Sequence, residues 1–175
     1  MEQIYNLENV AEYRKWYAVH TRSRHEKFVA KKLEDRQMEV FLPLYKTLNQ
    51  WKDRKKLVWL PLFRCYLFVM SAPEKWFAIL KTQGVVRILG NGKEGFVPIP
   101  QAEIDRVRHI VEVDFKKDPC PFITEGNKIY IKSGPLEGLE GILLKKKNEY
   151  RVVVSIELLQ RSVSVTVDTH DIKLL

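Results

Sequence analysis

The sequence predicts an α+β fold in two parts, and three observations lead to this prediction. In residues 1–113, apolar segments typical of strands alternate with amphipathic segments typical of helices. Residues 114–122 combine charge with two prolines and lack an apolar period, which is typical of a linker. Residues 123–175 hold several short β-rich segments between glycine-rich turns, which favours a small β-barrel.

The first elements expected are a strand over residues 16–21 and a helix after it. Residues 23–26, Ser-Arg-His-Glu, fit a capping box, in which the Ser hydroxyl and the Glu carboxylate accept hydrogen bonds from free amides at a helix start. The helix should run to about residue 38, with Phe28 and Val29 facing inward.

A hairpin should follow this helix. Its first strand begins at residues 40–45, where Pro43 indicates an edge position or a bulge. The basic stretch 51–56 is expected at the hairpin tip. Residues 61–70 are almost wholly apolar and rich in aromatic and β-branched side chains, so we expect one strand buried on both faces.

Two more helices and a short strand complete the first part. Residues 71–74 are a second capping-box candidate, and the helix they open should end at Gly84. A strand is expected over 85–89, and Pro100 should start a helix with Ile104, Val107 and Val111 on one face. The order β-α-β-β-α-β-α is close to the split βαβ arrangement of ferredoxin-like folds.

The charge of the chain is basic and unevenly distributed. Formal net charge is +8, and the isoelectric point is about 9.4. Residues 1–122 hold 22 Lys and Arg against 15 Asp and Glu, whereas residues 123–175 hold 8 against 7. An anionic partner such as nucleic acid is therefore expected for the first part, although basic surfaces also occur without one.

Other patterns exclude several classes of protein. Cys65 and Cys120 form neither a disulfide framework nor a zinc-type pair, which fits a reducing cytoplasm. No signal pattern or membrane-length apolar stretch is present, so we expect a soluble cytoplasmic protein with no membrane partner. No phosphate loop, metal-ligand spacing or nucleophile elbow is found, so no catalytic residue, metal or cofactor is expected.

The glycine-rich segment near the start of the second part carries a resemblance. By itself it indicates a tight turn in a barrel, where glycine lets chains bend and approach closely. In its detailed spacing, residues 129–141 resemble a KOW motif, an SH3-like barrel of transcription and ribosomal proteins. The motif positions are Gly134, Pro135, Leu136, Gly138 and Gly141.

With this motif in place, the first part resembles the N-terminal domain of the NusG family, called the NGN domain. The resemblance rests on residues 16–19, the helix after them and residues 61–69, and it extends from about Trp16 to Leu175. It implies an NGN domain over 1–113, a linker over 114–122 and a KOW domain over 123–175. Residues 20–27 and 50–56 look most like the specialised UpxY-type paralogues, which are bacterial antiterminators of polysaccharide operons.

The resemblance implies that the first domain binds RNA polymerase through an apolar patch that grips the clamp helices of the largest subunit. The phenylalanine and tyrosine of the family motif correspond to Phe63 and Tyr66, and Leu44 and Tyr45 are the expected neighbours. From the residues alone, Phe63 and Tyr66 are equally compatible with a place in the core. The family pattern has Pro-Gly where this chain has Arg64-Cys65, and Arg-Cys does not require a kink.

Cationic side chains at two places are expected to contact non-template DNA or nascent RNA. A helix start attracts phosphate, and in this family the hairpin tip projects toward nucleic acid. Solvated surface charge is the alternative at both places. The expected residues are Arg22, Arg24, His25 and Lys27 at the helix start, and Lys52, Arg54, Lys55 and Lys56 at the tip.

In the second part, Leu158, Leu159 and Arg161 occupy the position of a family loop that binds termination factor Rho or a small-subunit ribosomal protein. Taken together, these resemblances predict a monomeric elongation and antitermination factor that suppresses pausing or termination on specific operons such as polysaccharide clusters. Two alternatives remain: a housekeeping member that couples transcription to Rho or the ribosome, and a ribosome-associated RNA-binding protein.

Overall fold

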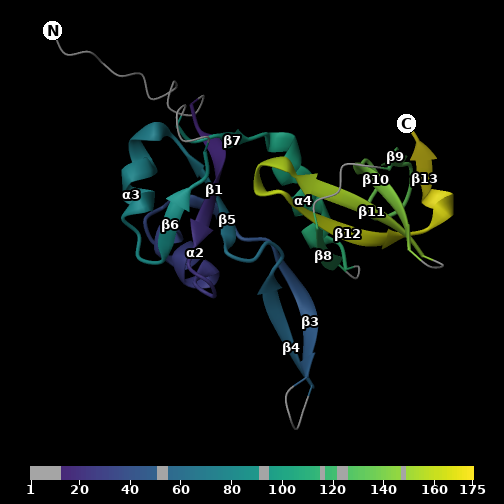
Figure 1. The fold of residues 1–175 in the computed structure, drawn as a ribbon, viewed down its shortest axis with the longest axis horizontal. Coiled ribbons are helices and arrows are strands. Elements are labelled where there is room, and N and C mark those ends of the chain that lie inside the picture. Colours follow the sequence, from purple (N-terminus) through teal and green to yellow (C-terminus); the bar gives the residue numbers. More distant parts are fainter. Residues whose placement is uncertain (1–12, 51–54, 91–94, 115–116, 122–125, 147–148) are drawn as a thin grey trace. The chain divides into compact units, whose positions relative to one another are not determined.

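The computed structural model describes residues 13–50, 55–90, 95–114, 117–121, 126–146 and 149–175, and the statements below concern these residues (Figure 1). The protein has a mixed α+β fold. The chain divides into two compact units. The first comprises the described residues of Met1–Leu42 and Arg64–Gln101, and the second those of Pro43–Phe63 and Ala102–Leu175.

The first unit is built on an antiparallel sheet. Its main path runs β2-β5-β1-β6, and β7 also pairs with β1. This is the strand order of the split βαβ arrangement, as the sequence predicts. The strands are β1 (Lys15–Thr21), β2 (Glu39–Phe41), β5 (Tyr66–Ser71), β6 (Val85–Ile88) and β7 (Pro98–Ile99).

One face of this sheet forms the core with helices α2 (Glu26–Glu34) and α3 (Trp76–Leu80). Successive side chains of a strand point to opposite faces, so Tyr17 and Val19 of β1 share this face. They pack in one cluster with Val29 and Leu33 of α2 and with Ile79 of α3. A 3-10 turn, η1 (Pro73–Lys75), precedes α3.

Helix α2 differs from its prediction in two respects. Val29 is buried as expected, but Phe28 is 41% exposed. The helix ends at Glu34 because Gln37 takes the left-handed conformation with φ 59°. The amide of Met38 then bonds to the carbonyl of Leu33, and the amide of Gln37 to that of Glu34, which is a Schellman motif.

The predicted hairpin strands are both interrupted. Residues 40–45 divide at Leu42-Pro43 into β2, which pairs with β5, and β3 (Leu44–Gln50), which pairs with β4 (Lys55–Pro61). Pro43 lies in this break, outside both strands, and not at the edge position or bulge that the sequence indicates. The prediction that residues 61–70 form one strand is wrong. Strand β4 ends at Pro61, β5 starts at Tyr66, and a turn lies between them.

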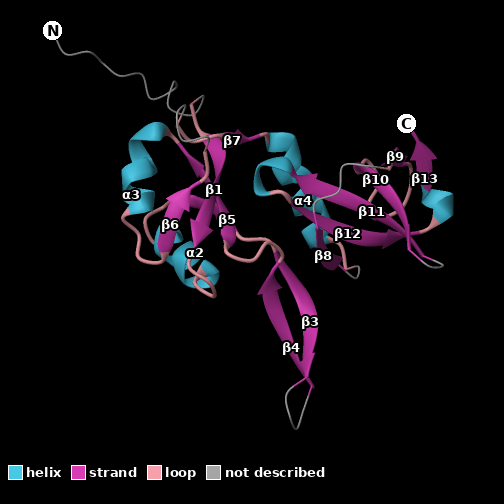
Figure 2. Ribbon diagram, in the orientation of Figure 1, coloured by secondary structure: helices cyan, strands magenta, loops and turns pink. Residues whose placement is uncertain are grey.

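The second unit contains an antiparallel six-stranded sheet with the order β13-β9-β10-β11-β12-β8 (Figure 2). Its interior is formed by buried Ile and Val side chains such as Ile129, Val152 and Val163. The strands are β8 (Lys117–Pro121), β9 (Asn127–Ile131), β10 (Glu140–Lys146), β11 (Glu149–Ile156), β12 (Arg161–Val167) and β13 (Ile172–Leu174). The 3-10 turns are η2 (Glu157–Leu159) and η3 (Thr169–Asp171).

Part of the predicted linker is a strand of this sheet. Residues Lys117–Pro121 form β8, which pairs with β12 at the end of the strand order. The prolines that suggested a linker are compatible with this place, because an edge strand needs backbone donors on one side only. The domain boundaries at 113 and 123 remain predictions.

The glycine-rich segment and helix α4 (Gln101–Glu112) agree with most of what the sequence indicates. Gly138 has φ 87°, and a Cβ atom on Gly141 would lie 2.6 Å from the carbonyl oxygen of Val153. Ile104 and Val107 are buried, and so is Ile110, whereas Val111 is only half-buried. No helix among the described residues has the length and apolar character needed to span a membrane.

The turn between β4 and β5 gives the first prediction. Cys65 has φ 66°, a conformation that costs an L-residue about 1 kcal/mol and glycine almost nothing. Cys65→Gly should therefore be about 1 kcal/mol more stable than Cys65→Ala in urea unfolding. At the exposed helical position Lys32, the order of the Gly and Ala variants should be reversed. Equal or greater stability of Cys65→Ala would contradict the role assigned to this backbone.

Candidate functional site

The site begins where β1 ends, at a junction of three chain segments in the first unit. The amide of Thr21 donates to the carbonyl of Cys65, and the amide of Arg22 donates to that of Gly84, each at 2.8 Å. The amide of Cys65 donates to Oε1 of Glu26, also at 2.8 Å. The end of β1, the start of α2 and the turn before β5 are therefore held together by hydrogen bonds.

Glu26 departs from the predicted capping box. Helix α2 begins after His25, and no side chain caps it. The carboxylate of Glu26 instead accepts from the turn residue Cys65, 39 positions away, and it is only 5% exposed. A carboxylate in the first turn of a helix is favoured by the helix dipole, which helps to offset its burial.

Five exposed cations, which we call the cationic edge, lie around this junction. Arg64 precedes Cys65 in the turn, and Arg87 stands on β6 opposite His20 of β1. Arg24 has φ 63°. The members of the cationic edge are Arg22, Arg24, Lys27, Arg64 and Arg87.

A row of three side chains crosses the sheet at the same end. Tyr66 and Arg87 are the register partners of His20 on its two sides, so all three lie on the face opposite α2 and α3. The rings of His20 and Tyr66 are 5.0 Å apart, and both residues are half-buried. Burial lowers the pKa of His20, and the charge of Arg87 lowers it further, so the imidazole is neutral at pH 7.

The predicted nucleic-acid-binding residues are partly brought together. Arg22, Arg24 and Lys27 are exposed members of the cationic edge, and His25 is half-buried with its ring perpendicular to that of Phe28. Lys55 and Lys56 are exposed on β4, at a separate place. Lys52 and Arg54 lie outside the described residues.

Sequence reasoning missed Arg64 and Arg87 as site candidates. Arg64 was visible as the single charge in an apolar run, which is the signal of a side chain that must reach solvent. Arg87 gave no such signal. Its place follows from the register of β6 against β1, and that register is a tertiary property.

The four residues predicted to contact polymerase have different surroundings. Tyr66 belongs to the first unit, whereas Leu44, Tyr45 and Phe63 belong to the second. Leu44, Tyr45 and Tyr66 are half-buried, and Phe63 is 2% exposed. Phe63 thus packs inside the protein in this structure, and its contact with polymerase remains a prediction.

The predicted partner loop of the second unit lies at η2 and the start of β12. Leu158 is half-buried, Leu159 is buried and Arg161 is exposed. Gln160, with φ 50°, makes the sharp turn between the two elements. Of these side chains, only that of Arg161 extends well into solvent.

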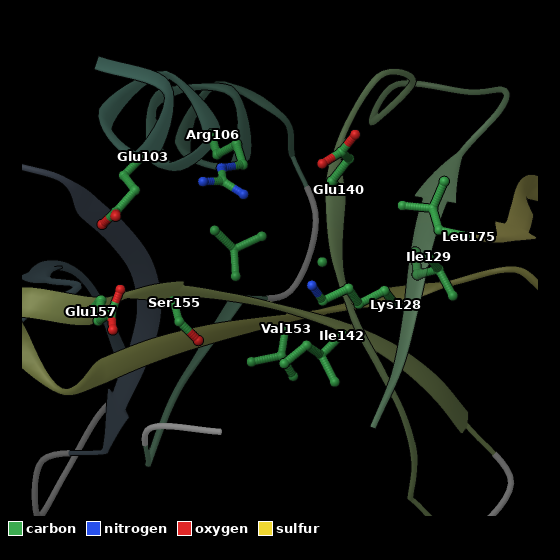
Figure 3. Close-up of a pocket in the computed structure, with 12 residues that line it drawn as sticks. Glu103, Arg106, Lys128, Ile129, Glu140, Ile142, Val153, Ser155, Glu157 and Leu175 are labelled. Carbon is green, nitrogen blue, oxygen red and sulfur yellow. The ribbon is translucent and has the colours of Figure 1, made fainter. Parts of the chain in front are cut away.

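A cavity of about 360 Å³ lies in the second unit, between α4 and strands β9, β10 and β11 (Figure 3). Its floor is apolar, with Ile142 and Val153, and Glu103 and Arg106 reach toward it from α4. Burial raises the pKa of Glu103, and the amide of Glu157 and the charge of Arg106 partly oppose this. The mixed charge of its rim gives no indication of a particular ligand.

In the part of the chain that the structure describes, no three potential metal-binding side chains (His, Cys, Asp or Glu) gather. What the first unit offers is a half-buried aromatic pair beside exposed cations. Such an arrangement can bind phosphate groups and flat or apolar surfaces.

We compared the sequence with models of known protein families. Residues 14–108 match the family model described as transcription termination factor NusG. The chain belongs to the NusG family. The match covers the whole first sheet, the β3–β4 hairpin and most of α4.

Two NusG proteins are similar to this chain over nearly their full length. The transcription termination/antitermination protein NusG of Staphylococcus carnosus is 28% identical over 174 residues, covering 91% of this chain and 95% of that protein. The Staphylococcus aureus protein of the same name has the same identity and coverage. A solved structure of Thermotoga maritima NusG has a TM-score of 0.55 at 24% identity and covers 93% of this chain and 98% of that one, which shows likeness of fold.

The NusG pattern explains the turn before β5. Family members usually carry Pro-Gly where Arg64-Cys65 stand, and glycine is the residue suited to a positive φ. Cys65 adopts that conformation without being glycine, so the chain turns here although the residue types Arg-Cys do not themselves require it.

The bond from Cys65 to Glu26 should support the whole junction. Glu26→Ala leaves a turn amide without its acceptor and should lower the free energy of unfolding by about 1–3 kcal/mol. Glu26→Gln keeps an acceptor oxygen and should lose less. Urea unfolding of both variants, with the exposed Glu34→Ala as control, checks this. If Glu26→Ala is no more harmful than the control, the junction does not depend on this carboxylate.

Glu103 should make stability depend on pH. Because its pKa is raised above the ordinary 4.5, the folded state binds the proton more tightly, and stability falls as pH rises through the raised value. Glu103→Gln should therefore raise the melting temperature at neutral pH relative to the wild type, and the gain should shrink toward pH values below 4.5. Glu137→Gln, at an exposed position, is the control. A gain that is independent of pH would contradict this assignment.

Proposed function

We propose that the protein is a transcription elongation and antitermination factor that binds RNA polymerase and suppresses pausing or termination. It acts on specific operons such as polysaccharide clusters, as the UpxY-type members of the NusG family do. Its first unit contacts the clamp helices of the largest subunit, and its cationic side chains contact non-template DNA or nascent RNA.

The observation that carries this proposal is the row of Tyr66, His20 and Arg87 beside the cationic edge, in a chain of the NusG family. A half-buried aromatic ring is the kind of side chain that contributes most to protein interfaces. Tyr66 presents one at the sequence position where the family motif carries its tyrosine. The cationic edge then supplies the positive charge that an upstream DNA fork requires.

The positive charge of the cationic edge should make its binding to nucleic acid depend on salt concentration. Each phosphate that a lysine or arginine neutralises releases counterions, so binding weakens as salt rises. Affinity for nucleic acid at this edge follows from phosphate contacts, and sequence preference needs base contacts in addition.

The proposed mechanism is binding, without a chemical step. A factor that binds the processive conformation of polymerase more tightly than the paused one shifts the equilibrium toward elongation. The shift can be no larger than the difference in binding free energy between the two conformations.

Polymerase binding and pausing can be measured with one set of variants. Tyr66→Ala should weaken binding to RNA polymerase by about 2 kcal/mol, or about 30-fold, because it removes a central aromatic contact. In single-round transcription, it should lose the suppression of pausing at concentrations where the wild type is active. Tyr66→Phe keeps the ring and should retain most of both activities.

Phe77→Ala removes another aromatic ring, 65% exposed on α3, and serves as the matched control. A wild-type protein that neither binds polymerase nor changes pausing would overturn the proposed function. Wild-type activity in Tyr66→Ala would remove Tyr66 from the polymerase site.

A further inference from the structure

An exposed apolar patch lies on α3 and β6, two elements of the first unit that are side by side (Figure 1). Phe77 is 65% exposed, Leu80 39% and Val86 52%. Phe77 and Leu80 are three positions apart on α3, so they share one side of the helix. We call Phe77, Leu80 and Val86 the α3 patch. No contact of the proposed function involves it.

The local structure explains why these side chains stay outside the core. Ile79 of α3 packs in the core cluster, so its neighbours on the helix face away from that cluster. The register of β6 shifts by one residue between His20 and Thr21 of β1, which makes Val86 the extra residue of a β-bulge. A bulge re-aims a side chain and interrupts pairing, so Val86 is free to meet a partner.

Positive charge surrounds the α3 patch. Lys81 places its ammonium 4.4 Å from the centre of the Phe77 ring. Residues 73–88 contain three cations and one carboxylate, and all four are exposed: Lys75, Lys81, Arg87 and, with the opposite sign, Glu74. The α3 patch therefore fits an apolar segment that carries negative charge.

Residues 1–12 of the same chain, which lie outside the described residues, have this composition. They contain three glutamates and no lysine, arginine or histidine, in a chain whose net charge is +8. Ile4, Leu7 and Ala11 follow the spacing that puts apolar side chains on one side of a helix. The glutamates flank this apolar stripe, where they can reach cations around an apolar surface.

The place where this segment joins the first unit favours the same conclusion. Lys15, at the start of β1, lies opposite Ser71, and η1 begins two residues after Ser71 and leads into α3. Twelve residues span about 18 Å as a helix and about 40 Å when extended, which is enough to reach along α3. A tether this short gives an effective concentration in the millimolar range, so even a weak contact is populated.

The family match does not explain this segment. The NusG family model covers residues 14–108, so the α3 patch lies inside the match and residues 1–12 lie outside it. A contact between the two is therefore a property of this chain, separate from what the family shares.

We infer that residues 1–12 dock on the α3 patch, with the stripe of Ile4, Leu7 and Ala11 on the apolar side chains and the glutamates beside the surrounding cations. The contact is intramolecular and shields apolar surface from water. The segment has to leave before another protein can bind there, so it controls access to this surface. The inference goes beyond the proposed function, because the contact needs neither polymerase nor nucleic acid.

Hydrogen–deuterium exchange of the full chain, read by mass spectrometry, tests this inference. Leu7→Asp removes an apolar contact and should speed exchange in residues 76–88 about threefold, the factor expected when the dissociation constant is about half the effective concentration. Asn9→Asp introduces the same charge away from the apolar stripe and is the matched control. It should exchange as the wild type does.

Phe77→Ala tests the other side of the contact. Docking protects both participants, so this variant should speed exchange in residues 1–12 at short labelling times. Phe28→Ala is its matched control, because Phe28 is 41% exposed on α2 and has the ammonium of Lys32 5.8 Å from its ring centre. Thermal unfolding verifies that each variant is folded.

Three outcomes would overturn the inference. The first is unchanged exchange in Leu7→Asp, and the second is an equal effect of Asn9→Asp. The third is protection that increases with protein concentration, because the segment would then bind a second copy of the chain.

The same variants separate this inference from the proposed function. If Leu7→Asp leaves exchange unchanged and Phe77→Ala loses polymerase binding, the α3 patch docks polymerase and only the inference fails. If the wild type does not bind polymerase at all, the proposed function fails. The exchange measurements still decide the inference, since they are made on the protein alone.

Discussion

A buried carboxylate holds the first unit together at the place where its candidate site lies. Glu26 accepts the amide of Cys65 at 2.8 Å and stands in the first turn of α2. Because Cys65 in turn accepts the amide of Thr21, one acidic side chain connects a helix, a turn and the end of β1. The register of β5 against β1 starts one residue later, at Tyr66, so the position of Tyr66 beside His20 depends on this bond.

The two faces of the first sheet have separate tasks. The face under α2 and α3 is filled with apolar side chains, Tyr17 among them, and provides stability. The other face carries polar and aromatic side chains at one end, where His20 lies between Tyr66 and Arg87. Since strand side chains alternate, a single sequence such as that of β1 serves both tasks at once.

The sequence predicted most elements of the first unit, but it missed the turns and it missed strand β8 within the segment expected to be a linker. Apolar periodicity located most strands of the first unit and the helix around Val29, whereas the part that the family resemblance gives to Tyr66 stays a prediction. The breaks at Gln37 and Cys65 could not be predicted, because each is a left-handed residue that is not glycine and is held by bonds to its neighbours. Glu26 was assigned to a local cap because its long-range partner, Cys65, becomes visible only in three dimensions.

Strand β8, at one end of the strand order in the second unit, affects how the chain can associate with itself. Alternate backbone groups of a strand point to opposite sides, so Pro119 and Pro121 remove two donors from the same side of β8. Asp118 and Cys120 alternate with these prolines and lie opposite Ser164 and Ser162 of β12. A second copy of the chain that approached this edge would find too few N–H groups to extend the sheet, and the edge is thereby protected against aggregation.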